Sequence, residues 1–183
     1  MPDRRPSASP VIDHGFGETE LTSCTGKQRP DAWQESSRLQ TGPLRVRALQ
    51  CLARRDYCRA ELRLKLAAEA ESAEQLDAVL DALQEERLLS DPRYAAQRVA
   101  ARAGRYGNTR LRQELRQKGV GDEDIAAALA QGDDESERCR AVWARKFGVL
   151  PQSVEERARQ MRFLQYRGFS GEVIRRVMAG GDE

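Results

Sequence analysis

The sequence predicts an all-α protein: three tandem three-helix repeats that form an elongated curved array, preceded by a disordered N-terminal tail. Three observations support this prediction. From residue 44 onward the chain is rich in Ala, Leu, Arg, Glu and Gln, which favour helices. Apolar residues recur there every three or four positions, and no stretch alternates apolar and polar residues as a half-buried strand does. The same apolar positions then return with a period of 49 residues.

Residues 1–42 have the opposite character. They contain many Pro, Ser, Thr and Gly and few apolar residues, so they cannot bury enough surface to offset the entropy lost on ordering. Their charges are nearly balanced, with five basic and six acidic side chains. We therefore expect a disordered tail that is not a basic arm.

Helix starts carry recognisable markers. Ser72 is followed by Gln75, and Ser153 by Glu156; both pairs match the capping box, in which the first side chain accepts from an unpaired backbone amide. Further candidate N-caps are Asp91 (before Pro92), Asn108, Asp122 and Ser170. Glycines are expected just after helix ends, at Gly107, Gly119 and Gly168. The nine expected helices span residues 44–55, 58–70, 73–88, 92–104, 108–118, 122–131, 135–147, 153–167 and 170–179.

The 49-residue period appears in several registers at once. The matching sets are Leu66, Leu115 and Leu164; Leu76, Ile125 and Ile174; and Leu80, Leu129 and Met178. Because each three-helix unit is too small to be stable alone, the units are expected to stack on their neighbours. We expect these repeats over residues 43–90, 91–132 and 133–183, the second of them basic. Such arrays offer long binding surfaces rather than deep catalytic pockets.

The composition argues against several classes of protein. No apolar run approaches the length of about 20 residues that a membrane-spanning helix needs. The only histidine, His14, lies in the tail, so the helical part has none for acid–base catalysis or metal binding. The four cysteines (24, 51, 58 and 139) form no CxxC pair. We expect a non-enzymatic, cytoplasmic monomer without cofactor, metal or membrane contact. Cys51 is expected in the core, and Cys58 and Cys139 at the surface or at helix boundaries.

Four stretches carry a resemblance to a known family. They are Arg47-Ala48-Leu49 with Glu61-Leu62 and Lys65-Leu66; Leu88-Leu89-Ser90-Asp91 with Tyr94-Ala95; Arg110-Leu111 with Glu114-Leu115 and Lys118-Gly119-Val120; and Phe163-Leu164 with Arg167-Gly168-Phe169-Ser170. On these motifs residues 44–180 resemble the RecX regulatory proteins, which modulate the RecA recombinase. The chain departs from the family pattern at Cys58, where Ser or Thr is usual, and at Arg87, where Gly is common.

The resemblance implies a function and a partner. A RecX protein is expected to bind the RecA–DNA filament, to inhibit or limit its recombinase and co-protease activity, and so to modulate DNA repair and the SOS response without catalysing a reaction. The implied fold is three tandem three-helix repeats. RecA, as a nucleoprotein filament, is the expected partner, and single-stranded DNA is a second candidate.

Charge is distributed unevenly along the helical part. Residues 92–119 hold eight basic side chains and one acidic side chain, whereas residues 45–89 hold eight basic and nine acidic ones. Because like charges spaced by four residues repel along a helix, this clustering favours a polyanion or an acidic protein groove as ligand. The candidate filament- or DNA-binding residues are Arg98, Arg102, Arg105, Arg110, Arg112, Arg116, Lys118, Arg162 and Arg167.

Aromatic residues in the basic segment are few. It contains only Tyr94 and Tyr106, and Tyr106 lies 49 residues after Tyr57, so a structural role is expected. Contact with phosphates or protein is therefore favoured over the base stacking that single-strand binders use. Two alternatives stay open. A helix-turn-helix-like regulator would bind DNA directly without RecA, and a helical scaffold would have no nucleic-acid role.

Overall fold

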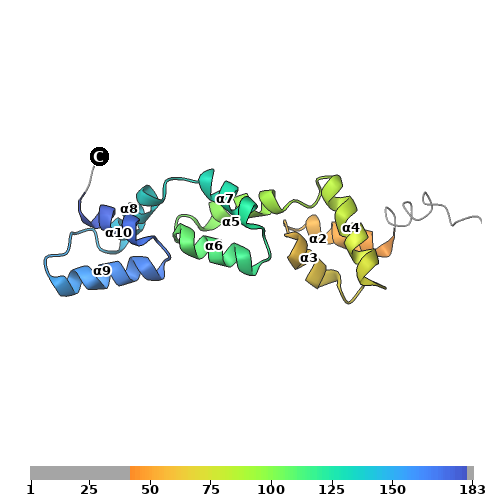
Figure 1. The fold of residues 1–183 in the computed structure, drawn as a ribbon, viewed down its shortest axis with the longest axis horizontal. Helices are drawn as coiled ribbons and strands as arrows, with labels where there is room; N and C mark the ends of the chain where they lie inside the picture. Colours follow the sequence, from red (N-terminus) through yellow and green to blue (C-terminus); the bar gives the residue numbers. More distant parts are fainter. Residues whose placement is uncertain (1–41, 181–183) are drawn as a thin grey trace, which may run out of the picture.

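The computed structural model describes residues 42–180, so the expected disordered tail lies, apart from Gly42, outside the described residues. Within that range there are nine helices and no strand, as Figure 1 shows. Their bounds are α2 (Pro43–Leu52), α3 (Arg59–Leu66), α4 (Ala73–Glu85), α5 (Asp91–Arg102), α6 (Asn108–Gln117), α7 (Asp122–Ala130), α8 (Glu135–Lys146), α9 (Val154–Tyr166) and α10 (Gly171–Met178).

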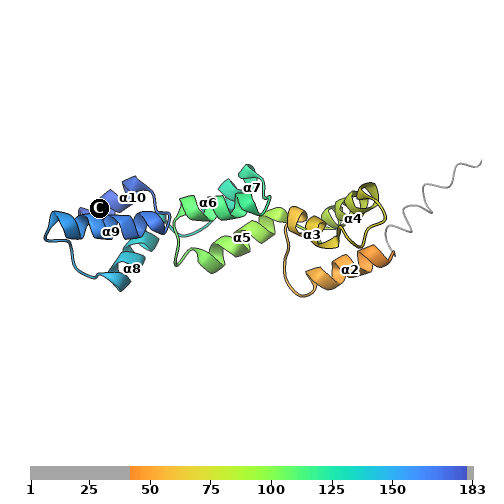
Figure 2. The ribbon, with the colours of Figure 1, turned by 90° about the horizontal axis from the view of Figure 1, so that it is seen from below.

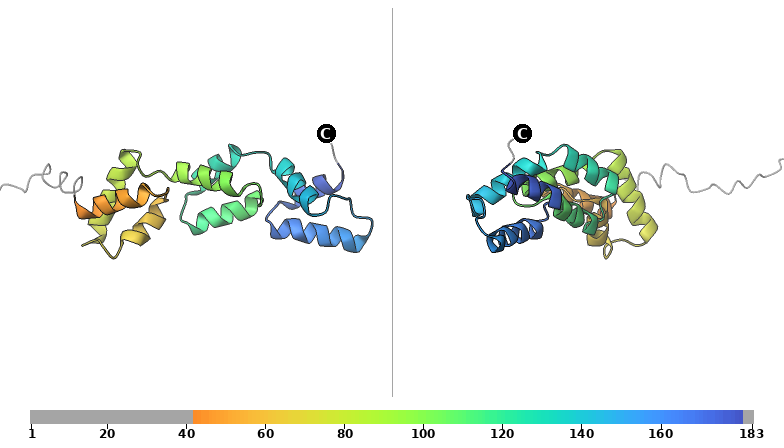
Figure 3. Two further views of the ribbon diagram at one scale, coloured as in Figure 1. Left: turned by 180° about the vertical axis from the view of Figure 1, so that it is seen from behind. Right: turned by 60° about the vertical axis from the view of Figure 1, so that its left-hand side comes forward.

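The nine helices form three lobes in a row. We name them the first repeat (α2–α4), the second repeat (α5–α7) and the third repeat (α8–α10); Figures 1 and 2 show them end to end, and Figure 3 shows the same row from behind. Each lobe has its own apolar core, represented by Leu62 and Leu80, by Leu111 and Ile125, and by Leu164 and Ile174. The predicted all-α tandem array is confirmed. We call the contacts between adjacent lobes the first and second junctions.

Side chains cap the helix starts, with some departures from expectation. Ser72 and Ser153 accept from the backbone amides of Gln75 and Glu156 as predicted, and Ser170 accepts from Val173. Three predicted caps are wrong by one residue, because Ser90, Gly107 and Gly121 are the N-caps in place of Asp91, Asn108 and Asp122. Each of the three predicted residues is instead the first residue of its helix.

Two acidic residues cap a helix of the preceding repeat. The N-caps of α3 and α6, Cys58 and Gly107, offer no side-chain cap. The backbone N–H of Arg59 donates instead to Asp91 Oδ1 at 2.7 Å, and that of Asn108 donates to Glu135 Oε1 at 2.7 Å. Each carboxylate lies at the start of the next repeat, so the second helix of one repeat depends on the first helix of the following one.

Glycines at the ends of α6 and α9 determine how the repeats meet. Gly119 and Gly168 have φ of 80° and 81°, and the next residue in each case bonds back to a leucine carbonyl five positions earlier, the Schellman pattern. This turn exposes backbone to the preceding repeat. Gly107 N–H donates to Arg167 O at 3.0 Å, and Thr109 N–H donates to Gly168 O at 3.1 Å.

The cysteines correct one expectation. Cys51 is buried as predicted, and Cys58 lies at a helix boundary, as the N-cap of α3. Neither Cys58 nor Cys139 is a surface residue, because both are fully buried, with 0% exposure. Cys58 packs in the core of the second repeat, and its Sγ donates to Lys118 O at 2.9 Å. Burial raises the pKa of the Cys139 thiol to about 12. Cys58 therefore packs across the first junction, whereas Cys51 and Cys139 pack in the cores of the first and third repeats.

The aromatic side chains mostly have structural positions. Tyr57 and Tyr94 are buried, and Tyr106 packs half-buried against the second core. Trp143 packs against the third core and donates from Nε1 to Gln160 Oε1 at 2.7 Å. None of the helices between residues 42 and 180 has the length and apolar character needed to cross a membrane.

Candidate functional site

Four of the predicted binding residues lie against carboxylates. Arg98 and Arg102 of α5 both reach Glu114 of α6, with N–O distances of 2.6 and 3.0 Å. Two further ion pairs join Arg116 to Asp122 at 2.6 Å and Lys118 to Glu61 at 3.5 Å. Arg98 and Arg102 are therefore folded against α6, where they share one carboxylate that offsets part of their charge.

The pKa values of the partner acids follow this arrangement. A hydrogen bond from Arg116 lowers the pKa of Asp122. The pKa of Glu61 is lowered first by its hydrogen bond from Arg55 and further by the charges of Arg55 and Lys118. Both carboxylates are thus held in the ionised form that neutralises the arginines and the lysine.

Cations at the second junction have different partners. Arg110 Nη1 donates to Tyr166 O at 3.3 Å, and Arg167 Nη1 donates to Arg105 O at 3.3 Å. A backbone carbonyl satisfies a guanidinium N–H but carries no net charge. These two side chains are therefore positioned, and no carboxylate between residues 42 and 180 is paired with them.

One tyrosine ring collects several of these cations. The guanidinium carbons of Arg102, Arg110 and Arg167 lie 4.9, 4.7 and 5.7 Å from the centroid of Tyr106. Cation–π attraction holds a guanidinium at a ring face without neutralising it. Tyr106 thus gathers arginines from α5, α6 and the end of α9, which confirms its structural role and explains why they converge.

A hollow beside this cluster adds two cations from the third repeat. It has a volume of about 210 Å³ and is lined by Gly104, Arg105, Val142, Arg145, Lys146, Phe163 and Arg167. Arg145 and Lys146 lie about 40 residues from Arg105 along the chain, so charge density in the basic segment does not reveal them. Only the fold brings them together. We define the junction patch as Arg105, Arg110, Arg145, Lys146 and Arg167.

The other two predicted residues lie on outer helix faces. Arg112 is exposed on α6, where it lines a shallow hollow with Thr109, Gln113, Arg116 and Gln117. Arg162 is exposed on α9. The structure therefore brings Arg105, Arg110 and Arg167 together and places Arg112 and Arg162 outside that cluster.

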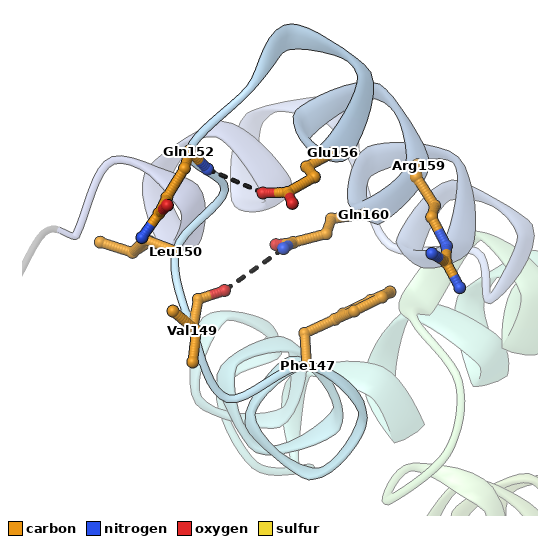
Figure 4. A pocket seen from close by; sticks show the side chains of 7 residues that line it. All are labelled: Phe147, Val149, Leu150, Gln152, Glu156, Arg159 and Gln160. Atoms are coloured by element: carbon orange, nitrogen blue, oxygen red, sulfur yellow. Dashed lines mark hydrogen bonds between the residues drawn. The ribbon is translucent and has the colours of Figure 1, made fainter.

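One hollow within the third repeat has a structural explanation. It holds about 360 Å³ beside the loop between α8 and α9, and Figure 4 shows its lining residues. Gln160 Nε2 donates to Val149 O at 3.2 Å, and Gln152 N–H donates to Glu156 Oε2 at 2.9 Å. These two bonds fasten the loop to α9.

Comparisons with known proteins agree with this architecture. Family models described as the second and third three-helix domains of RecX match residues 90–129 and 133–178. The chain is 47% identical over 141 residues to the regulatory protein RecX of Ralstonia pickettii (strain 12J), covering 76% of this chain and 89% of that protein. It is 48% identical over 147 residues to the regulatory protein RecX of Ectopseudomonas mendocina (strain ymp), covering 77% and 97%.

Solved structures show the same fold. The crystal structure of RecX from Lactobacillus salivarius superposes with a TM-score of 0.69 at 18% identity, covering 79% of this chain and 97% of that one. A second crystal structure, of a regulatory protein RecX, gives a TM-score of 0.64 at 23% identity, covering 82% and 80%. Sequence identity, family models and tandem three-helix architecture therefore agree, and the chain belongs to the RecX family of regulatory proteins.

Proposed function

We propose that this protein binds the RecA–DNA filament in the cytoplasm and limits its recombinase and co-protease activity, without catalysing a reaction itself. The junction patch, with Arg112 and Arg162 on either side, would be the contact surface. The observation that carries this assignment is the pairing of Arg110 and Arg167 with neutral carbonyls, which leaves their charge available to an anionic partner. Membership of a family of regulatory proteins supports the choice of RecA.

The remaining predicted contacts take a secondary place in this proposal. Arg98, Arg102, Arg116 and Lys118 each have a carboxylate partner, so a ligand must first compete with an existing ion pair. Their contribution to binding should be smaller than that of the exposed arginines. The elongated row of repeats supports the proposal further, because it can follow the length of a filament.

The test is inhibition of RecA-dependent ATP hydrolysis on single-stranded DNA. The variant replaces three exposed arginines, Arg105, Arg112 and Arg145, with Ala. We expect the concentration needed for half inhibition to rise about tenfold or more, since each lost charge-assisted contact weakens binding. A matched control variant replaces Arg47, Arg54 and Arg63 of the first repeat, which removes the same charge from the other end of the molecule.

Thermal unfolding must first show that both triple variants fold as the original protein does. If the variant at residues 105, 112 and 145 then inhibits as strongly as the original protein, the proposed surface is wrong. Sequence-preferring duplex binding without an effect on RecA would favour a direct DNA-binding regulator. Absence of binding to DNA and filament at low salt would favour a helical scaffold.

A further inference from the structure

One large aromatic side chain is exposed beside the junction patch. Tyr166, at the C-terminal end of α9, is 76% exposed, whereas Tyr57 and Tyr94 are buried. Figure 1 shows this end of α9 next to the start of α6, and the bond between Gly107 N–H and Arg167 O joins the two helices there. The ring of Tyr166 therefore reaches solvent at the second junction.

Arg110 connects Tyr166 to the rest of the patch. Its guanidinium carbon lies 5.6 Å from the Tyr166 centroid and 4.7 Å from the Tyr106 centroid. The Arg110 guanidinium also donates to the backbone oxygen of Tyr166. Since Arg167 shares the Tyr106 ring, a continuous set of contacts runs from the exposed tyrosine to the uncompensated cations.

An exposed ring next to unneutralised cations suits one class of polyanion. Single-stranded nucleic acid stacks its unpaired bases on aromatic rings while lysines and arginines hold its phosphates. A duplex offers the same phosphates, but its bases are stacked on one another. The aromatic residue thus provides what phosphate contacts alone lack, a preference for single strands.

We propose that Tyr166 is a nucleobase-stacking residue, and that with Arg110 and Arg167 it forms a binding site for single-stranded nucleic acid at the second junction. This inference rests on the proposed function in one respect: the junction patch must meet a polyanion. It adds a chemical role for a residue outside the basic segment. It also reverses the expectation that the scarcity of aromatic residues argues against base contacts.

The test measures binding of a short oligothymidylate and of an abasic oligonucleotide of the same length, each at two salt concentrations. Tyr166→Ala removes the ring but keeps the backbone oxygen that Arg110 bonds. Tyr166→Phe keeps the ring. Leu64→Ala is a control for loss of exposed apolar surface, because Leu64 is 79% exposed in the first repeat.

We expect Tyr166→Ala to bind oligothymidylate about tenfold more weakly, with the salt dependence unchanged, because base stacking is lost while phosphate contacts remain. Binding of the abasic strand should not change, and Tyr166→Phe and Leu64→Ala should bind both strands normally. The inference is overturned if Tyr166→Ala binds oligothymidylate normally, if it loses affinity for both strands equally, or if the original protein binds neither.

RecA inhibition by the same variants separates this inference from the proposed function. If the original protein leaves RecA unaffected, the proposed function fails, yet a thymidylate-specific defect of Tyr166→Ala would still establish stacking. If Tyr166→Ala binds both strands normally while the original protein inhibits RecA, only the stacking role is lost.

Discussion

The two junctions share a carboxylate cap and a glycine turn but differ in how their cations are paired. At the first junction Arg93 bonds Asp56 at 3.1 Å, and Lys118 and Arg55 both contact Glu61. At the second junction the corresponding charged groups bond backbone carbonyls and tyrosine or phenylalanine rings. The first junction is therefore close to electrically neutral, and the second keeps its positive charge.

This difference shows that a cation can have its N–H donors hydrogen-bonded without having its charge neutralised. A carbonyl removes the cost of an unpaired N–H donor but leaves the long-range field in place. A carboxylate accepts the hydrogen bond and also neutralises the charge. An array of similar repeats can therefore stack through related contacts and still present charge at only one of its junctions.

The largest expected effect is from Gly107→Ala, which should disrupt the second junction alone. An added methyl group would overlap the backbone carbonyl of Gly168, and neither main chain can move without separating the repeats. We expect the free energy of unfolding, measured in urea, to fall by about 3 kcal/mol. The amide of Thr109, which donates to Gly168 O, should also exchange its hydrogen faster.

Gly121→Ala is the matched control for this substitution. Gly121 is likewise the N-cap of a helix, but the nearest atom to an added Cβ is Asp124 Oδ2 at 4.0 Å. Its effect should stay within about 0.5 kcal/mol. Equal effects of the two substitutions would contradict the close approach of backbones at the second junction.

The next effect in size is expected from Arg138→Ala, which removes a buried side chain of the second junction. Arg138 is 6% exposed and donates to the backbone oxygens of Asp133, Ala103 and Tyr106. Truncation leaves buried carbonyls without partners, so stability should fall by about 2 kcal/mol. Thermal unfolding measures this, with Arg157→Ala on the exposed face of α9 as control.

The corresponding place in α5 is held by Tyr94, which is the fourth residue of its helix just as Arg138 is of α8. The first junction thus packs an aromatic ring where the second bonds an arginine to neutral acceptors. If Arg138→Ala were as stable as the original protein, the second junction would not depend on those bonds. The two junctions would then differ only in surface charge.

The smallest effect is expected from Glu61→Gln, which acts at the first junction. Arg55 and Lys118 lower the pKa of Glu61, so its carboxylate stabilises the folded state above the ordinary pKa of glutamate. That stabilisation is lost as the pH falls through the lower pKa of the folded protein. At neutral pH Glu61→Gln should cost about 1 kcal/mol.

Urea unfolding at a series of pH values checks this prediction. The difference between Glu61→Gln and the original protein should disappear in acid. By contrast, the loss of stability caused by Arg138→Ala should persist in acid, because the neutral carbonyls that Arg138 bonds do not titrate there. A Glu61→Gln effect that is independent of pH would contradict the ionic character of the first junction.

Most of the fold could be predicted from local signals. Hydrophobic spacing, capping boxes at Ser72 and Ser153 and the glycines at 119 and 168 all act within a few residues. The errors at Asp91, Asn108 and Asp122 have another origin, because the chain places the N-cap one residue earlier in all three cases and two glycines cap without a side chain. The burial of Cys58 likewise depends on the second repeat packing over it.

The candidate site was less predictable. Arginines of the basic segment could be selected from charge density alone, but density does not reveal which of them face a carboxylate. Glu114 is the single acid of residues 92–119, and it pairs with two arginines. Arg145, Lys146 and Tyr166 join the site only because the third repeat stacks on the second; the 49-residue period predicts that stacking but not which side chains it brings together.

Asp91 and Glu135 accept hydrogen bonds from the first turns of helices in the preceding repeat, so these helix starts are completed in chain order. A ribosome delivers α3 and α6 before the carboxylates that complete their first turns. The first and second repeats therefore each emerge with one helix start uncapped, and the next repeat supplies the cap. Each of these two repeats should therefore finish folding only after the next repeat has been synthesised. The neutral first junction should form before the charged second junction.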